Sequence, residues 1–593
     1  MIVPMKKATV IVQAKDSSLA IGALRALGVM HLEHQRTPAP KELGMLQDEL
    51  ALIDTALGAL SADDLEQQDS SVAKEEPDDW RYLARHVLDI RNRISQLKEY
   101  AFSLSNSISQ WLTWGDFNPE TIRALKEKGV EIRLYQIPVK EIAALSTDLI
   151  VKKISVYAGI ANCMLISRRP IELAYKEVTL PKMGLAAMQE RLAVNNKTVD
   201  LLKQEMGKLT SRRLSLLRIK NMFEEELEFH QALKGMGQAQ AFAYVRGYVP
   251  NDAERAVRDE AQRQQWGLVI SDPSGEDNVP TLVRNPRWIA VISPLFRFIE
   301  IVPGYRELDI SLCFLIFFSI FFGMIVGDAG IGLIFLGLIY FAQRKLGKKL
   351  KDHSLFILLY ICSGCAVIWG LLSGTCFGQE WLTKFYPPPI PALRNDKAVQ
   401  AFCFFLGALH LSIAHVWRAM LKLPALSALA DIGWILILWG GFFLARLLVL
   451  AETFPAFANW LFISGIILVL FFTNPQKNVL KAIGSGLGTL LLNLVNSFTD
   501  VVSYIRLFAV GLATVAMADA FNRMALEMGG NSLLGGLVTA IILFTGHALN
   551  VVLSPMSVLV HGVRLNVLEF CSHADVKWSG FVYNPLRKKI NSI

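Results

Sequence analysis

One arginine stands inside the most apolar part of the sequence. Arg506 lies in SYIRLFAVGLAT (503–514), and the chain is apolar on both sides of it. A guanidinium keeps its proton, so placing it at the centre of a bilayer costs from roughly 2.5 to more than 10 kcal/mol, depending on the reference state. Charges inside membrane segments mark ion pathways and proton relays. Arg506 is therefore the first candidate functional residue.

The next apolar stretch carries a regular stripe of polar side chains. Their spacings of 3, 4, 3, 4 and 3 residues hold them on one face of a helix for more than four turns. The stripe consists of His547, Asn550, Ser554, Ser557, His561 and Arg564. Lipid tolerates such a face only in a bundle interior or along a water-filled path. The alternative interpretation of each residue is a hydrogen bond between helices.

The two arginines have no obvious carboxylate partner between them in the sequence. Asp500 and Glu569 lie toward the expected cytosolic ends of the two helices. A purely structural Arg506 should have an acid within one helical turn, and none is present. We therefore expect the missing acid to come from another chain.

These residues belong to a membrane half of the protein. Of the 593 residues, 52% are hydrophobic, and nearly all long apolar runs fall in 310–572. Segments of this length and composition predict membrane-spanning helices. The eight predicted spans are 309–327, 329–343, 354–377, 399–417, 430–450, 458–474, 484–523 and 532–572, and the last two are long enough to be tilted.

The basic residues predict the orientation of these spans. With the N-terminus inside, the cytosolic loops and tail hold 13 Lys and Arg, whereas the outer loops hold only Lys384, Arg394, Lys397 and, at the edge, Arg523. Such an asymmetry is typical of cytosolic loops. Both termini are therefore expected in the cytosol, and the net charge of +8 needs no nucleic acid to explain it.

The first 300 residues are mixed and charged, and they start without a signal-peptide pattern. They predict a cytosolic arm of α/β lobes, about 1–40 with 240–285 and about 115–175. Three stretches of heptad spacing predict a coiled coil over 41–114 and 180–235 that joins the lobes as a long antiparallel stalk. Asn195 fills one core position of the third stretch. The fold class is thus α+β lobes on a stalk, followed by an eight-helix all-α membrane domain over 301–593.

The sequence offers no chemistry for catalysis by this chain alone. It has no Walker A motif, zinc-finger spacing or triad-like cluster, and no cofactor or metal is expected. Cys362 and Cys365 form a CxxC inside an apolar run, where small packing residues are the better interpretation. Asp328 lies at the outer turn of the first hairpin, and we expect it to cap a helix rather than line a channel.

Several motifs together resemble the membrane stator subunit of V/A-type rotary ATPases, called subunit I in bacterial and archaeal enzymes and subunit a in eukaryotic ones. The motifs are VRGYVP (245–250), VPTLVRNPRW, FFGMIVGDAGIGL (321–333), SYIRLFAVGLAT and HGVRLNVLEF (561–570). The usual Asp-Pro-Thr before the first span is here Asp309-Ile310-Ser311. The modest length and short outer loops resemble the bacterial and archaeal members, which implies a cell-membrane location.

The resemblance implies specific partners and roles. A ring of proteolipid subunits (c/K-type) would supply the missing carboxylates, and Arg506 and Arg564 would face them. His547, Asn550 and Ser554 would lie toward the outer half-channel, Ser557 and His561 nearer the arginines, and Glu569 and Asp500 toward the cytosol. The arm would bind E/G-type peripheral stalks and the d/C-type subunit that connects rotor and ring. The complex would couple H⁺ or Na⁺ movement to ATP hydrolysis or synthesis.

Two alternatives belong to other classes of protein. A secondary transporter with a cytosolic regulatory domain predicts two similar membrane halves with paired broken helices, and no such repeat is visible. A coiled-coil membrane scaffold without transport leaves Arg506 and the polar stripe unexplained.

Overall fold

The computed structural model describes residues 1–33, 35–36, 40–60, 79–145, 149–157, 159–171, 173–347, 352–379, 387, 389–473, 479–528 and 533–588. The chain forms two compact units. One consists of Met1–Ala8, Gly247–Gln264 and Leu268–Pro585, and the other of Thr9–Arg246, Gln265–Gly267 and the chain from Leu586. Part of the predicted coiled coil (61–78) and the loop lysines Lys348, Lys349, Lys351, Lys384, Lys477 and Lys589 lie outside the described residues.

The first sheet uses strands from both ends of the soluble sequence. Its order is β2-β8-β1-β9, and β7 pairs with β8. The strands are β1 (Met5–Gln13), β2 (His31–Glu33), β7 (Gly237–Ala239), β8 (Phe242–Pro250) and β9 (Gly267–Ser271). Helices α1 (Ser17–Leu27) and α7 (Glu254–Arg263) follow β1 and β8 along the chain. The predicted α/β character of the start of the chain is confirmed.

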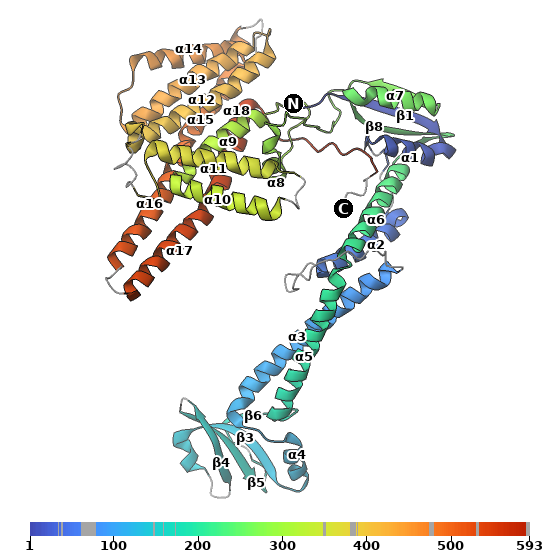
Figure 1. Cartoon of the computed structure of the whole chain (residues 1–593), viewed down its shortest axis with the longest axis vertical. Helices are drawn as coiled ribbons and strands as arrows, with labels where there is room; N and C mark the ends of the chain where they lie inside the picture. Colours follow the sequence, from blue (N-terminus) through green and yellow to red (C-terminus); the bar gives the residue numbers. More distant parts are fainter. Residues whose placement is uncertain are drawn as a thin grey trace. The chain divides into compact units, whose positions relative to one another are not determined.

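A second, antiparallel sheet forms a separate lobe. Its order is β4-β5-β3-β6, with Glu131 opposite Ser167 in the β3–β5 register. The elements are β3 (Glu131–Pro138), β4 (Ile150–Tyr157), β5 (Ile160–Ser167), β6 (Lys176–Val178) and α4 (Pro119–Glu127). Figure 1 shows this lobe beside the ends of α3 (Trp80–Trp111) and α5 (Leu185–Thr210), and Trp111, Trp114, Leu134 and Met188 share a core there.

Four long helices continue the soluble part. Helix α3 packs along α5, and α2 (Pro40–Leu60) packs along α6 (Arg213–Lys234). Apolar residues from all three heptad stretches, among them Ile53, Leu57, Leu83, Val87 and Met206, meet in one core. Asn195 is buried in this packing, and its Nδ2 donates to the Leu97 carbonyl at 2.7 Å. The long helices thus bury their predicted apolar faces against one another.

The second half of the chain is almost entirely helical. Six of the described helices are long and apolar enough to cross a membrane, and Ser311–Val326 and Ala456–Phe472 are shorter apolar helices. The helices are α9 (Ser311–Val326), α10 (Ala329–Leu346), α11 (Ser354–Ser373), α12 (Asp396–Lys422), α13 (Ala428–Leu450), α14 (Ala456–Phe472), α15 (Val479–Ser503), α16 (Ile505–Met528), α17 (Leu533–Ser557) and α18 (Cys571–Ala574). The count of eight spans stays a prediction.

The turn between α9 and α10 is held by one buried carboxylate. Gly327 ends α9 with φ +66°, a conformation that favours glycine. Fully buried Asp328 caps α10 by accepting from the backbone N–H groups of Gly330 and Ile331 at 2.8 and 3.0 Å. It also accepts from Phe377 and Gly378 N–H at 2.9 and 2.6 Å. The predicted cap is confirmed, and it also ties the turn to the segment after α11.

Candidate functional site

Arg506 is the second residue after a break between two helices. α15 ends at Ser503 and α16 begins at Ile505, within the apolar stretch Leu490–Met528. The residue at the break, Tyr504, is fully buried, and its hydroxyl lies 2.8 Å from His410 Nδ1 on α12. A side chain at Gly407 would meet the Tyr504 ring at 2.7 Å. Helix α12 therefore fixes the backbone from which Arg506 projects.

Helix α9 fixes the next turns of α16. A Cβ at Gly511 would lie 2.5 Å from the Met324 carbonyl, so only glycine allows this approach. Thr514 Oγ1 donates to the Ile325 carbonyl at 3.0 Å. Small residues and side-chain hydrogen bonds are the usual means of close helix packing in membranes. Arg506 is thus carried on a segment held from two sides.

Glu569 lies between the two arginines. Its Oε1 is 3.7 Å from Arg506 Nη1 and 3.6 Å from Arg564 Nε. The Glu569 side chain is only 5% exposed, against 23% for Arg506 and 52% for Arg564. The expectation that the chain supplies no carboxylate near Arg506 is therefore wrong. Sequence analysis assigned Glu569 to the cytosolic end and missed its place beside both cations.

Glu569 lies beside Arg564 because the helix changes type in this segment. The chain is π-helical over Val558–Gly562 and again over Leu565–Phe570. On an α-helix, positions 564 and 569 would point about 140° apart. A π-helix bonds residue i to residue i+5 and is wound more loosely, so residues five apart lie much closer to the same side of the helix. The second π-helical segment therefore places Glu569 beside Arg564.

The pairing leaves the site with excess positive charge. Two guanidinium groups share one carboxylate, and separations of 3.6 and 3.7 Å are too long for hydrogen bonds. Among the described residues, buried Arg506 Nη1 and Glu569 Oε2 have no hydrogen-bond partner. Buried polar groups are normally satisfied. The site therefore has one uncompensated cation and donors free for a further acceptor.

The polar stripe of the last long helix is divided in two. The α-helical spacing ends at Ser557, so the six residues do not form one continuous α-helical face. Asn550 donates to the Thr514 carbonyl at 3.0 Å, and Ser554 donates to the Asn550 carbonyl at 2.7 Å. His547 Nε2 lies 3.2 Å from Asn522 Oδ1. These three residues bond within the α16–α17 pair, whereas Ser557 and His561 are half-buried beyond them.

Asp500 belongs to a chain of polar contacts that the sequence did not reveal. Its Oδ2 lies 3.1 Å from His573 Nε2, and His573 Nδ1 lies 2.9 Å from His415 Nε2. His415 Nδ1 is in turn 3.2 Å from Asp431 Oδ1, and Lys422 Nζ donates to Asp431 Oδ2 at 2.6 Å. His415 and Asp431 are ionisable residues inside apolar spans, which was the available signal. The contacts join α12, α13, α15 and α18.

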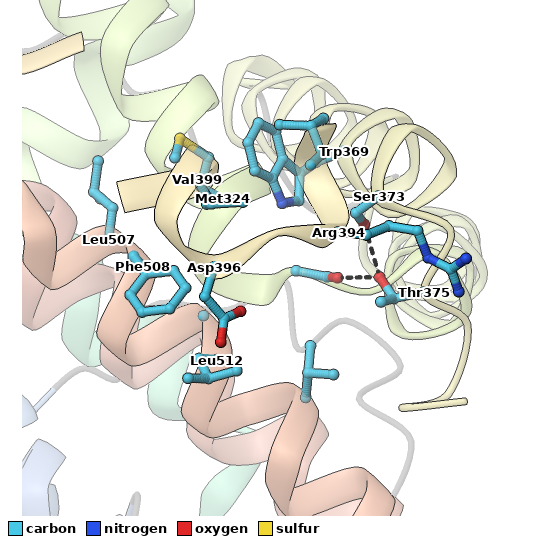
Figure 2. Close-up of a pocket in the computed structure, with 14 residues that line it drawn as sticks. Met324, Trp369, Ser373, Thr375, Arg394, Asp396, Val399, Leu507, Phe508 and Leu512 are labelled. Carbon is cyan, nitrogen blue, oxygen red and sulfur yellow. Dashed lines mark hydrogen bonds between the residues drawn. The ribbon is translucent and has the colours of Figure 1, made fainter. Parts of the chain in front are cut away.

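A cavity lies against the part of α16 that follows Arg506, whereas Asp500 precedes Arg506. It has a volume of 190 Å³, and Leu507, Phe508 and Leu512 form its α16 wall. In Figure 2 the Asp396 carboxylate points toward Phe508 and Leu512, and Thr375 donates to the Gly327 carbonyl at 2.6 Å. Both Arg394 and Asp396 line the cavity from the start of α12. The sequence analysis named Arg394 only as a loop charge and missed Asp396.

The described residues contain no group of three His, Cys, Asp or Glu side chains placed to hold a metal ion. Their fold and site define a multi-span membrane protein with an N-terminal α/β part and two arginines that converge on one carboxylate.

Comparisons with known proteins agree with this class. The chain is 30% identical over 625 residues to V-type ATP synthase subunit I of Borreliella burgdorferi, covering 99% of this chain and 100% of the relative. It is also 30% identical over 637 residues to V-type ATP synthase subunit I 1 of Treponema pallidum, with 99% and 100% covered. A-type ATP synthase subunit I of Methanocaldococcus jannaschii is 25% identical over 439 residues, covering 66% and 62%. No family model matches the chain.

Identity and coverage of this extent show that the chain belongs to the V-type ATP synthase subunit I family. It is thus a membrane subunit of a rotary ATPase. A solved structure, the cytoplasmic N-terminal domain of subunit I, homolog of subunit a, of V-ATPase, covers 45% of this chain and 100% of that chain at 14% identity. Its TM-score is 0.23, which is too low to support an argument about the fold.

Proposed function

We propose that this chain is the stator of a V/A-type rotary ATPase and that Arg506 and Arg564 face the carboxylates of a proteolipid ring. The observation that carries the proposal is the charge imbalance, because two cations converge on the single carboxylate of Glu569. A carboxylate on another chain is the group that would balance it. The membrane half over 301–593 would translocate H⁺ or Na⁺, and the chain would hydrolyse no nucleotide itself.

The arginine would act by changing the protonation of each ring carboxylate that passes it. A nearby cation favours the charged form of an acid, so the acid releases its ion there. Facing lipid, the same acid must be neutral, because a bare buried charge costs several kcal/mol. The fixed cation also separates the entry path from the exit path. Arg506, which is the less exposed arginine and whose Nη1 has no hydrogen-bond partner among the described residues, would make the main contact.

Two polar features flank Arg506 and suit the two half-channels. The cavity beside Asp396 is also lined by Arg394, which is expected in a loop on the outer side of the membrane. We therefore assign this cavity to the outer half-channel. The contacts from Asp500 through His573 and His415 to Asp431 lie toward the expected cytosolic ends, and we assign them to the inner one. His547, Asn550 and Ser554 remain candidates for the outer path, and Ser557, His561 and Glu569 for the region between.

The soluble half would hold the stator against torque. The packing of α3 on α5 and of α2 on α6 supports an antiparallel coiled-coil stalk over 41–114 and 180–235. Its lobes, about 1–40 with 240–285 and about 115–175, would dock E/G-type peripheral stalks and the d/C-type connector. Eight spans would place both termini in the cytoplasm of a bacterial or archaeal cell.

The test compares Arg506→Ala with Arg523→Ala in the purified complex. Arg523 lies on the same helix, is 74% exposed and pairs with Asp519 at 2.7 Å, so it controls for the loss of a cation from α16. We expect ATP-driven ion uptake into vesicles to fall at least tenfold for Arg506→Ala and less than twofold for Arg523→Ala. Co-purification of ring and stalk subunits checks assembly. Normal coupled uptake by an assembled Arg506→Ala complex would refute the proposal.

A further inference from the structure

A large cavity lies where the chain enters the membrane helices. Its volume of 820 Å³ falls within the range of about 300–1,000 Å³ typical of small-molecule sites. Apolar side chains including Leu282, Phe296 and Ile301 form most of its wall, and Arg284 and Arg297 line it as well. All of these residues belong to the compact unit that contains the membrane helices. The cavity combines an apolar interior with guanidinium groups.

The surrounding segment has the composition of a membrane interface. The short helix α8 (Ser293–Phe298) and the turn before it pack against α11, and that turn also packs against α9. Trp288 and Phe298 are 61% and 70% exposed in the same segment. Exposed aromatic side chains beside apolar helices are typical of the lipid headgroup region. In the headgroup region, phospholipids would have access to the cavity.

Among the described residues, the arginines at the cavity are held by exposed ion pairs. Arg297 pairs with Asp352 at 3.2 Å, and both side chains are more than half exposed. Arg284 pairs with Asp252 in an equally exposed contact. Such surface pairs contribute about 0–1 kcal/mol, so the guanidinium groups can turn to another anion. Glu300 also lines the cavity and is the one carboxylate among its lining residues.

An unsatisfied hydroxyl lies in the cavity wall. Thr281 is 3% exposed, and its Oγ1 has no hydrogen-bond partner among the described residues. The backbone at Thr281 is fixed, because its N–H donates to the Phe581 carbonyl at 2.8 Å and its carbonyl accepts from Tyr583 N–H at 3.1 Å. A buried hydroxyl without a partner costs roughly 1–3 kcal/mol. The oxygen is itself shielded from the cavity, so an ester or phosphate oxygen there would accept from it only after the Thr281 side chain rotates.

We propose that this cavity is a binding site for one anionic phospholipid. An acyl chain fills the apolar interior, and the phosphate meets Arg284 and Arg297. Charge complementarity favours an anionic headgroup over a zwitterionic one. The proposal goes beyond ion translocation, and it concerns neither arginine of the candidate site.

The test measures lipid retention by the full-length protein. Delipidated protein is incubated with phosphatidylglycerol or with phosphatidylcholine of the same acyl chains, and native mass spectrometry counts the lipid that remains bound. We expect one retained phosphatidylglycerol and at least fivefold less phosphatidylcholine. Ala290→Phe fills the cavity and should abolish retention of both, whereas Arg284→Gln with Arg297→Gln should remove the preference. Arg287→Gln, which removes an exposed cation that does not line the cavity, should change neither.

Equal retention of the two lipids by the unaltered protein would overturn the proposal, as would full retention by Ala290→Phe. A second measurement needs no variant. Amide hydrogen exchange of 281–303 should slow at least threefold in phosphatidylglycerol nanodiscs relative to phosphatidylcholine nanodiscs. Identical exchange in the two would also overturn the proposal.

Discussion

At the scale of single residues, Glu569 decides how the two arginines are arranged. It is almost fully buried and lies within 4 Å of both, so each guanidinium is positioned partly by the same carboxylate. Breaking a buried ion pair leaves the remaining charges uncompensated, and this costs about 3–5 kcal/mol in favourable cases. Since Arg564 is half exposed, the cost here should be at the low end.

We therefore predict that Glu569→Gln destabilises the membrane domain by about 3 kcal/mol. The partner variant Arg564→Gln should be milder, and Arg564→Gln with Glu569→Gln together should be less destabilising than the sum. Thermal unfolding in nanodiscs gives all three values, and a double-mutant cycle isolates the coupling, expected at roughly 1 kcal/mol or more. If the destabilisations of the two single variants simply added, Arg564 and Glu569 would not interact despite their separation of 3.6 Å.

At the scale of elements, the sequence predicted where the helices lie, but it did not predict where they change from α-helical to π-helical. Apolar run lengths placed α9 to α14 within a few residues of their observed bounds, because burial in lipid demands long apolar helices. The π-helical segments around Arg564 follow from tertiary packing, which periodicity alone does not contain. The arginines were therefore found from their types. Glu569 was also a candidate from the sequence, but its place beside both arginines emerged only from the structure.

The same limit applies to the polar chain through His415. His415 and Asp431 each stand alone in an apolar run, and only the packing of α12, α13, α15 and α18 brings them within hydrogen-bond distance of each other and, through His573, of Asp500. Asp396 was missed because the chain from the end of α11 to the start of α12 has no periodic pattern. Asn195 was placed correctly, since a polar residue in a heptad core position faces the partner helix.

The first membrane hairpin gives a prediction at this scale. Asp328 accepts from four backbone N–H groups, and hydrogen bonds to a charged group contribute about 1.5–3 kcal/mol each. Asp328→Ala should therefore lower the free energy of unfolding by about 3 kcal/mol or more. Asn395 caps α12 through a single bond to Lys397 N–H at 3.0 Å, so Asn395→Ala should cost only about 1 kcal/mol. If Asp328→Ala and Asn395→Ala shifted thermal unfolding equally, Asp328 would not be the stronger of the two caps.

At the scale of the whole molecule, one carboxylate joins segments from distant parts of the sequence. Glu307 lies before the first membrane helix and accepts from the backbone N–H of Gly304 at 2.7 Å. It also accepts from Lys577 and Trp578 N–H, both at 3.1 Å, and from the Ser579 hydroxyl at 3.0 Å. The segment after the last helix is thereby bound to the segment that enters the membrane.

This junction should depend on pH. Burial raises the pKa of Glu307, but hydrogen bonds from Gly304, Ser579 and Lys577 outweigh it, so the pKa lies below its usual value. A depressed carboxyl pKa stabilises the folded contact above the unfolded pKa, about 4.3, and this stabilisation is lost as the pH falls through the folded pKa. Amide exchange at 577–580, corrected for intrinsic rates, should therefore accelerate below about pH 4.

Glu307→Gln removes the titrating group, so its exchange at 577–580 should be fast at every pH and show no such step. Asp309→Asn is the matched control in the same segment. Burial raises the pKa of Asp309, whereas the Met1 amine and Ser311 lower it overall, yet it makes no hydrogen bond to 577–580 among the described residues. The acid step should therefore persist in Asp309→Asn. If the step vanished there and survived in Glu307→Gln, the pH dependence would belong to the Met1–Asp309 contact instead.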